Sequence, residues 1–158
     1  MIKIIAVGKI KEDFYEKAIA EYLKRLSAYV KVNVIQVADE KCGEGISEKE
    51  ADIVRHKEAE RILKNIKDTD YVITLEIKGK ETDSEGFAKF INSLNLKGCS
   101  DIAFVIGGSI GLSAEVSKRA DHKLSFSKMT FPHQLMRVIL LEQIYRAYKI
   151  IKNEPYHK

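Results

Sequence analysis

The feature that most constrains this chain is an alternation, from one end to the other, of short apolar runs rich in β-formers with longer stretches of helical periodicity. Such an alternation is typical of α/β domains in which parallel strands are joined by helical crossovers. The third and fourth apolar runs are hydrophobic enough to be central strands, so a mostly parallel sheet flanked by helices is predicted. Strands are expected at residues 2–7, 30–37, 71–77, 102–106 and 123–127, and helices at 13–26, 47–66, 84–94, 113–120 and 132–153.

The length and composition favour one domain. With 158 residues, 45% of them hydrophobic, the chain can bury one core and is short for two, so a single domain over residues 1–158 is expected. Cys42 and Cys99 are far apart and indicate neither a disulfide framework nor a metal site. The opening residues are too short for a signal-peptide core, and no apolar run reaches the roughly 20 residues that span a bilayer. We therefore expect a cytoplasmic protein with no membrane or metal partner.

The positive charge of the chain is concentrated at its C-terminal end. Residues 117–158 hold 9 of the 27 lysines and arginines but only 3 of the 23 acidic residues, which leaves 18 against 20 for residues 1–116. A basic segment gains free energy by displacing counterions from the phosphates of a nucleic acid. A solvated surface that is merely basic explains the same counts, because charge balance bears on association and not on fold.

The expected last helix is more apolar than a surface helix requires. It begins at Pro132, a residue favoured in a first helical turn, and ends near Asn153, shortly before Pro155. Its apolar residues, Ile139, Ile144 and Tyr148 among them, cover more than one face. A surface helix of a monomer needs one apolar stripe, so a homodimer built partly on this helix is predicted. The alternative is a helix buried at the centre of a single chain.

An apolar run at residues 102–106 leads directly into the glycines Gly107, Gly108 and Gly111. Ligands of parallel α/β sheets bind beyond the carboxyl ends of strands, where glycines let the backbone approach them closely. A tight turn without a ligand is the alternative. The spacing fits neither the P-loop nor the dinucleotide fingerprint, so a phosphate cradle is not indicated.

Two further segments carry residues suited to ligand or RNA contact. Residues 126–133 combine hydroxyls, a methionine and phenylalanines that suit an adenine-sized slot, although these phenylalanines equally suit an ordinary core. The tail, residues 153–158, ends in Tyr156, His157 and Lys158, which suit stacking on a base, proton transfer and phosphate pairing. Most chain ends fray and have no such role.

Several separated motifs, taken together and in order, carry a family resemblance. They lie at residues 6–9, 72–76, 106–113, 131–133, 137–138, 142–147 and 153–158. On these motifs the chain resembles, over essentially its whole length, the RlmH family of 23S rRNA (pseudouridine-N3)-methyltransferases. The resemblance implies a SPOUT fold, an α/β knot with a mostly parallel sheet of five or six strands and a C-terminal trefoil knot. Pattern alone would not suggest a knot, because knots are nearly absent from proteins.

The resemblance also implies a cofactor, partners and site residues. The cofactor is S-adenosylmethionine, and the partners are 23S rRNA in the ribosome and a second copy of the chain. The glycine loop reads Gly-Gly-Ser-Ile-Gly where some relatives have Pro-Glu in its middle, and the chain ends at Lys158 where some have Arg. By motif position, the residues expected to bind the donor are Leu75, Gly107, Phe126, Ser127, Lys128, Met129, Thr130 and Phe131.

The expected chemistry requires the loss of a proton. The N3 proton of a uracil-type base is a weak acid between two carbonyls, so a base or a cation that stabilises the imide anion is needed. A water-poor pocket favours transfer from the cationic donor to this anion, because charge is dispersed as the methyl group moves. His157 is the candidate base, with Tyr156 and Arg137 in the catalytic set, while Arg146 and Lys158 are candidates for RNA contact. Which cation holds the anion and which a phosphate stays open.

Two rival functions remain at this point. The first is a non-catalytic, ribosome-associated RNA-binding domain, which would not bind S-adenosylmethionine. The second is a small-molecule α/β enzyme or flavodoxin-like binder that holds a phosphorylated ligand on the glycine loop. The absence of phosphate-loop spacing counts against the second.

Overall fold

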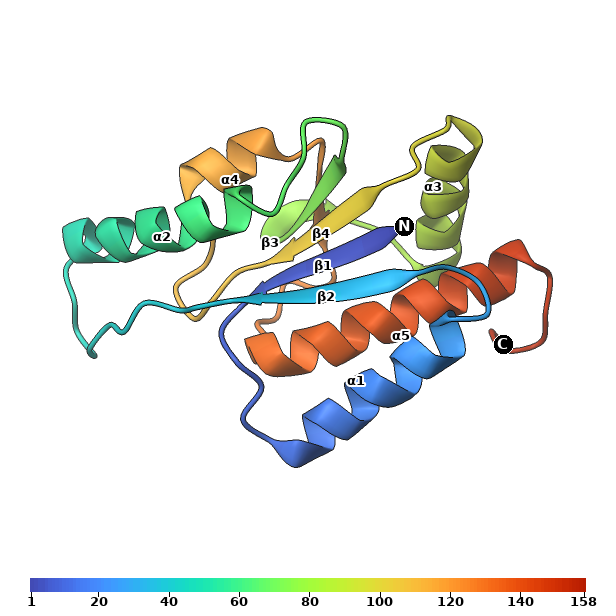
Figure 1. Cartoon of the computed structure of the whole chain (residues 1–158), viewed down its shortest axis with the longest axis horizontal. Coiled ribbons are helices and arrows are strands. Elements are labelled where there is room, and N and C mark those ends of the chain that lie inside the picture. Colours follow the sequence, from blue (N-terminus) through green and yellow to red (C-terminus); the bar gives the residue numbers. More distant parts are fainter.

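A five-stranded parallel sheet with the strand order β2-β1-β4-β3-β5 is the middle layer of the computed structural model, which describes residues 1–158 (Figure 1). This confirms the predicted α/β class and parallel sheet. The strands are β1 (Ile2–Val7), β2 (Val32–Val37), β3 (Tyr71–Glu81), β4 (Ile102–Ile106) and β5 (His122–Ser125). The helices are α1 (Asp13–Leu26), α2 (Glu48–Leu63), α3 (Ser84–Leu96), α4 (Ala114–Arg119) and α5 (His133–Ile151).

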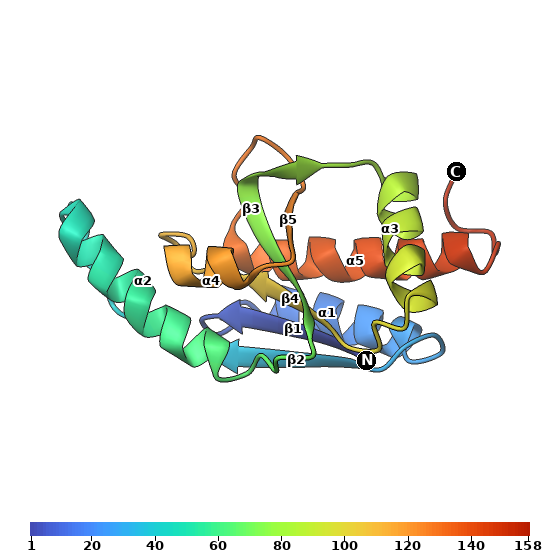
Figure 2. The same cartoon turned by 90° about the horizontal axis from the view of Figure 1, so that it is seen from above.

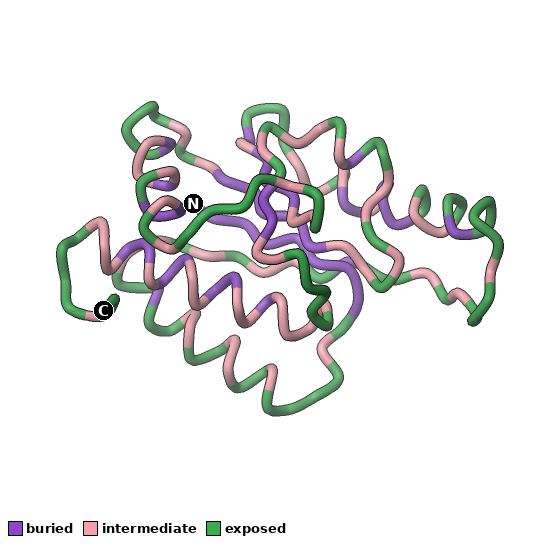
Figure 3. The backbone as a smooth tube through the Cα atoms, turned by 180° about the vertical axis from the view of Figure 1, so that it is seen from behind, coloured by how far each residue is buried: buried purple, intermediate pink, exposed green.

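Helices cover both faces of this sheet. Helices α1, α3 and α5 pack on one face, and α2 and α4 pack on the other (Figure 2). Because successive strand residues point to opposite faces, Ile4 joins the core under α5 and Ile5 joins the core under α2. Strands β1 and β4 are buried along their whole length (Figure 3). The third and fourth strands are interior as predicted, and β1 is interior as well.

Strand β3 bends where it passes β5, and this bend shapes the site. Leu75 and Lys80 both pair with Leu124, so the chain between them is looped out of the ladder. A Cβ at Gly79 would lie 2.8 Å from the backbone of Leu124, so only glycine fits this close approach. From the sequence, this strand was predicted to end at residue 77, because the apolar alternation stops at the bend. In the structure, β3 continues to Glu81.

Helix α5 is buried within a single chain. It packs against both α1 and α3, and Leu140, Ile144 and Tyr148 are covered by these neighbours and by the sheet. The apolar residues on its second face are therefore explained inside one copy, as in the alternative of a buried central helix. The argument for a dimer is therefore wrong for Ile144 and Tyr148, whereas Ile139 is only partly buried, and the dimer itself stays a prediction.

The helix termini follow local rules that the sequence already indicated. Ser47 and Glu50 form the predicted capping box at the start of α2. Helix α5 ends at Ile151, and Asn153 takes a left-handed φ of 54° that turns the chain away. None of the helices combines the length and the apolar run that crossing a membrane would require.

Candidate active site

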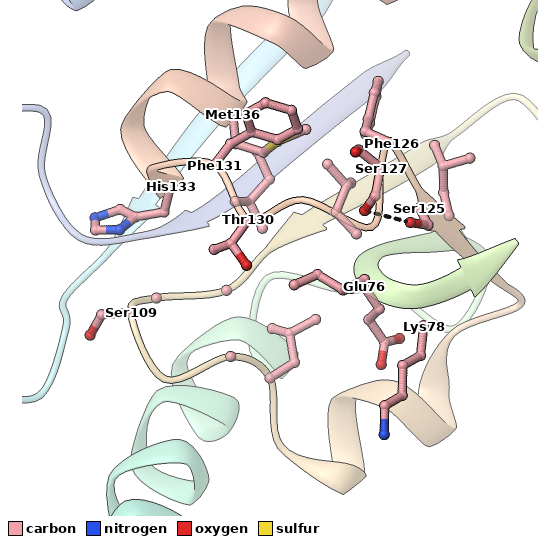
Figure 4. A pocket seen from close by; sticks show the side chains of 18 of the residues that line it. Glu76, Lys78, Ser109, Ser125, Phe126, Ser127, Thr130, Phe131, His133 and Met136 are labelled. Carbon is pink, nitrogen blue, oxygen red and sulfur yellow. Dashed lines mark hydrogen bonds between the residues drawn. The ribbon is translucent and has the colours of Figure 1, made fainter. Parts of the chain in front are cut away.

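A cavity of about 680 Å³ opens at the carboxyl ends of β3, β4 and β5 (Figure 4). This is the edge at which ligands of parallel α/β sheets bind. Its walls are the looped-out part of β3, the glycine loop after β4, the segment after β5 and the first turns of α5. Three separate parts of the chain, namely the bend of β3, the glycine loop and the stretch that runs from β5 into α5, therefore converge on one site, together with Arg55 of α2.

The cavity brings together seven of the eight residues that were predicted to bind a methyl donor. The exception is Lys128, which does not line it. Within the segment after β5, the Met129 side chain is 74% exposed, so it lies at the mouth. The seven lining residues are Leu75, Gly107, Phe126, Ser127, Met129, Thr130 and Phe131.

The glycine loop has a fixed shape. The Gly111 N–H donates to the Gly108 carbonyl at 3.1 Å, and Gly111 has a φ of +82°, which favours glycine. A Cβ at Gly107 would lie 3.1 Å from the Gly111 backbone and from the Leu112 side chain. The glycine at 107 is thus required by the packing of the loop on itself, as well as by any ligand beside it.

The segment after β5 offers unpaired backbone donors. The Ser127 hydroxyl accepts from the Met129 N–H at 3.0 Å, and the Ser125 hydroxyl donates to the Ser127 carbonyl at 3.1 Å. The other backbone N–H groups of this segment have no hydrogen-bond partner within the chain; they belong to Phe126, Ser127, Lys128, Thr130 and Phe131. Free backbone donors beside apolar walls are suited to the polar edge of a heteroaromatic ring.

Few charged groups line the cavity. Arg55 is held by Glu48, by Asp52 at 2.8 Å and by the Ile110 carbonyl at 3.4 Å. Burial and the nearby Arg137 guanidinium lower the pKa of His133, so its imidazole is neutral near pH 7. Glu76 is the only carboxylate in the lining, and Lys78 lies beside it.

Comparison with known proteins identifies the family. The family model described as predicted SPOUT methyltransferase matches residues 1–157. The chain belongs to the SPOUT methyltransferases. Proteins called ribosomal RNA large subunit methyltransferase H from Clostridium kluyveri and Clostridium botulinum are 57% and 60% identical to it, each over 99% of both chains. The recognised family is thereby confirmed.

The fold has a counterpart among solved structures. A probable methylase family protein from Haemophilus influenzae superposes with a TM-score of 0.51 at 15% identity. The match covers 96% of this chain and 66% of that one. At this identity the likeness bears on the fold alone.

In this SPOUT methyltransferase, Arg137 does not line the cavity. Its side chain is buried, and Nη2 donates to the carbonyls of Val7 at 2.9 Å and Gly8 at 2.7 Å. Its Nε and Nη1 have no partner. The structure thus places this predicted catalytic cation beneath the cavity, where it joins α5 to the end of β1. A direct catalytic role stays a prediction.

The tail, with its predicted catalytic and RNA-binding residues, follows the C-terminal end of α5 (Figure 1), whereas His133 and Met136 at the N-terminal end of this helix line the cavity. The Tyr156 hydroxyl donates to Glu142 at 3.1 Å, and the Arg146 guanidinium lies 4.7 Å from the centre of the Tyr156 ring. His157 Nδ1 lies 3.2 Å from Arg146 Nη1. The tail thus folds back on α5. Lys158 is exposed.

Several residues that line the cavity were not predicted from the sequence. Glu76 and His133 stand inside motifs that carried the resemblance, and that position was the only available signal for them. Lys78 and Arg55 had no signal, because the first depends on the bend of β3 and the second comes from α2, far away in the sequence. No group of three or more His, Cys, Asp or Glu side chains is placed to hold a metal ion.

Proposed function

We propose that this SPOUT methyltransferase is an rRNA methyltransferase that binds S-adenosylmethionine in the cavity and methylates N3 of a pseudouridine in 23S rRNA, on the assembled ribosome. The observation that carries the proposal is the convergence of seven expected donor-binding residues on one cavity at the carboxyl edge of the sheet. The names of these relatives support ribosomal RNA as the substrate. The trefoil knot of the family and the homodimer belong to the same proposal.

The cavity suits the adenosine part of such a donor. Leu75, Phe126 and Met136 provide apolar walls for a flat ring, and the free N–H groups after β5 match its polar edge. S-adenosylmethionine supplies an electrophilic methyl group on a sulfonium. Walls that exclude water favour the transfer, because opposite charges on donor and acceptor are dispersed in the transition state.

The residues of the chain must also remove the N3 proton. In the folded-back tail, Arg146 can only donate, so His157 Nδ1 is assigned as the acceptor of that contact. The lone pair that a base needs is therefore occupied. His157 acts as the base only after the tail leaves Arg146. The freed guanidinium is then available to an RNA phosphate or to the imide anion.

Within one chain the tail is far from the cavity, and a second copy of the chain could bring its own tail close to that cavity. Helix α5 has 19 residues, so its ends are about 28 Å apart at 1.5 Å per residue. The tail lies at one end, and His133 and Met136 lie at the cavity at the other end. We therefore propose that the tail of one copy serves the cavity of its partner in a homodimer.

Methyl transfer from labelled S-adenosylmethionine tests the function. Whole ribosomes, free large subunits and naked rRNA are compared as substrates, and the modified nucleoside is identified. Label at N3 of pseudouridine, strongest with whole ribosomes, is the expected result. A chain that binds ribosomes but not S-adenosylmethionine would instead be the non-catalytic RNA-binding domain.

A further inference from the structure

The charged side chains of the cavity include one pair of opposite sign, Glu76 and Lys78, neither of which forms an ion pair within the chain. Among the lining residues, Glu76 is the only carboxylate. Arg55 is occupied by two carboxylates and a carbonyl, and His133 is neutral near pH 7. Lys78 has no hydrogen-bond or ion-pair partner in the chain, so it is the one cation of the lining that is free to bind a ligand.

The Glu76 carboxylate is held in a fixed position. The Thr74 hydroxyl donates to its Oε2 at 2.5 Å, and the Ser117 hydroxyl donates to its Oε1 at 3.0 Å. A carboxylate has about four lone-pair sites, so two hydroxyl donors leave it able to accept further hydrogen bonds. Glu76 is therefore oriented by β3 and α4 and still has the capacity to bind.

Glu76 and Lys78 lie next to each other because of the bend in β3. Both belong to the segment that is looped out between Leu75 and Lys80. Figure 4 shows their side chains running alongside each other on the same side of the cavity. They form no ion pair with each other within 4 Å, so the two charges remain open to a third group.

We propose that Glu76 and Lys78 together bind the zwitterionic amino-acid end of the methyl donor. Glu76 accepts from its α-ammonium, and Lys78 donates to its α-carboxylate. An α-amino acid carries these two opposite charges at adjacent positions, which matches an adjacent carboxylate and ammonium of the protein. A ribose diol would also suit Glu76, but a neutral diol gives no reason for the unpaired Lys78 beside it. The inference rests on the proposed function and specifies how its donor is held.

Three ligands separate the parts of the donor. S-adenosylmethionine and S-adenosylhomocysteine both carry the amino-acid end, and only the first carries the sulfonium. The third, 5′-methylthioadenosine, keeps the adenosine and the sulfur but lacks the amino-acid end. Calorimetric titration of the full chain with each ligand therefore shows which part of the donor a given side chain binds.

Glu76→Gln and Lys78→Met are the test variants, and Glu81→Gln and Lys80→Met are matched controls on the same strand outside the lining. Glu76→Gln should weaken S-adenosylmethionine and S-adenosylhomocysteine equally, by about tenfold. Lys78→Met should weaken both by about threefold, because Lys78 is exposed and its charge is screened by water. Binding of 5′-methylthioadenosine should not change in either variant, and the controls should match the wild type.

The results that would overturn this inference differ from the result that would overturn the proposed function. Equal weakening of 5′-methylthioadenosine would place Glu76 at the ribose or show a damaged fold, and weakening of S-adenosylmethionine alone would place it at the sulfonium. Either result, or no change at all, overturns the inference while the proposed function stands. Lys78 has no partner to lose, so its variant is informative even if Glu76→Gln fails to fold. A wild-type chain that binds none of the three ligands would overturn the proposed function as well.

Discussion

The Glu58 carboxyl group lies directly beneath Gly108 of the glycine loop, where a Cβ on Gly108 would come within 3.4 Å of Glu58 Oε1. Glu58 is 4% exposed, its Oε2 accepts from the Glu40 N–H at 3.0 Å, and its Oε1 has no partner. Burial raises the pKa of this carboxyl above its ordinary value and the Asp39 carboxylate adds to the effect, while the hydrogen bond from the Glu40 N–H and the Arg61 charge oppose it. The floor of the glycine loop thus contains an acid that folding favours in its neutral form.

Glu58 should make the free energy of unfolding depend on pH. Between the unfolded and the raised folded pKa, the native state holds the proton that the unfolded chain has released, so wild-type stability falls as the pH rises through this window. Glu58→Gln does not titrate at this position. The free energy of unfolding of Glu58→Gln minus that of the wild type should therefore grow with pH and level off above the folded pKa. Urea denaturation measured across the pH range checks this.

The control for Glu58 is Glu44→Gln, because Glu44 is exposed and has no partner in the chain. Its substitution removes no contact, so the free energy of unfolding should differ from that of the wild type by no more than about 0.5 kcal/mol. If the difference for Glu58→Gln does not change with pH, folding does not shift the pKa of Glu58 and burial does not govern it.

Arg137 should contribute mainly to the stability of the fold and not directly to the methylation reaction. Arg137→Ala removes both donors to Val7 and Gly8 and leaves a cavity under α5, so the free energy of unfolding should fall by about 3 kcal/mol. Arg25→Ala removes an exposed pair with Glu21 and contacts with the Tyr22 and Tyr145 rings, and it should cost less stability than Arg137→Ala. A stable Arg137→Ala chain that binds the donor but does not methylate would restore the catalytic role that the sequence suggested.

The sequence predicted the sheet well because burial on both faces leaves a direct trace in the apolar runs of β1 and β4. For α5, the apolar residues led to the prediction of a dimer interface. A helix packed between α1 and α3 has the same excess of apolar residues as a helix at such an interface, so the sequence does not distinguish the two. Motif position placed Leu75 and Phe126 at the cavity. It gave no distances, so it could not show that Arg137 is buried or that the tail lies a helix length away.

Tyr156 should act as a hydroxyl donor and not as a base. Burial raises the pKa of Tyr156 to about 12, and its contact with the Glu142 carboxylate acts in the same direction. Its phenol is therefore protonated in the folded-back tail, and the ordinary tyrosine pKa of about 10 keeps it protonated near neutral pH after the tail has left Glu142 and Arg146. Tyr156→Phe should lower the methylation rate without moving the inflections of the pH–rate profile. A lost inflection below pH 10 would show that Tyr156 titrates during the reaction.

The proposal that two copies share one site makes a prediction about mixtures. Deleting Tyr156, His157 and Lys158 should abolish methylation and leave S-adenosylmethionine affinity nearly unchanged, because the tail lies a helix length from the cavity. Gly107→Val should abolish donor binding, because even a Cβ at this position would press on Leu112 and Gly111. Each variant alone is expected to be inactive, and each keeps the half of the site that the other lacks.

Co-refolding the two inactive chains should restore methylation. Random pairing makes half of the dimers mixed, and each mixed dimer has one intact cavity facing one intact tail, so about a quarter of the wild-type activity is expected. His157→Ala in place of the deletion should behave in the same way if His157 is the base. A mixture that stays inactive while both chains fold and pair means that tail and cavity act within one copy, and the tail must then travel the length of α5. Full methylation by the deletion variant alone would mean that the tail has no part in the reaction and that the base is elsewhere.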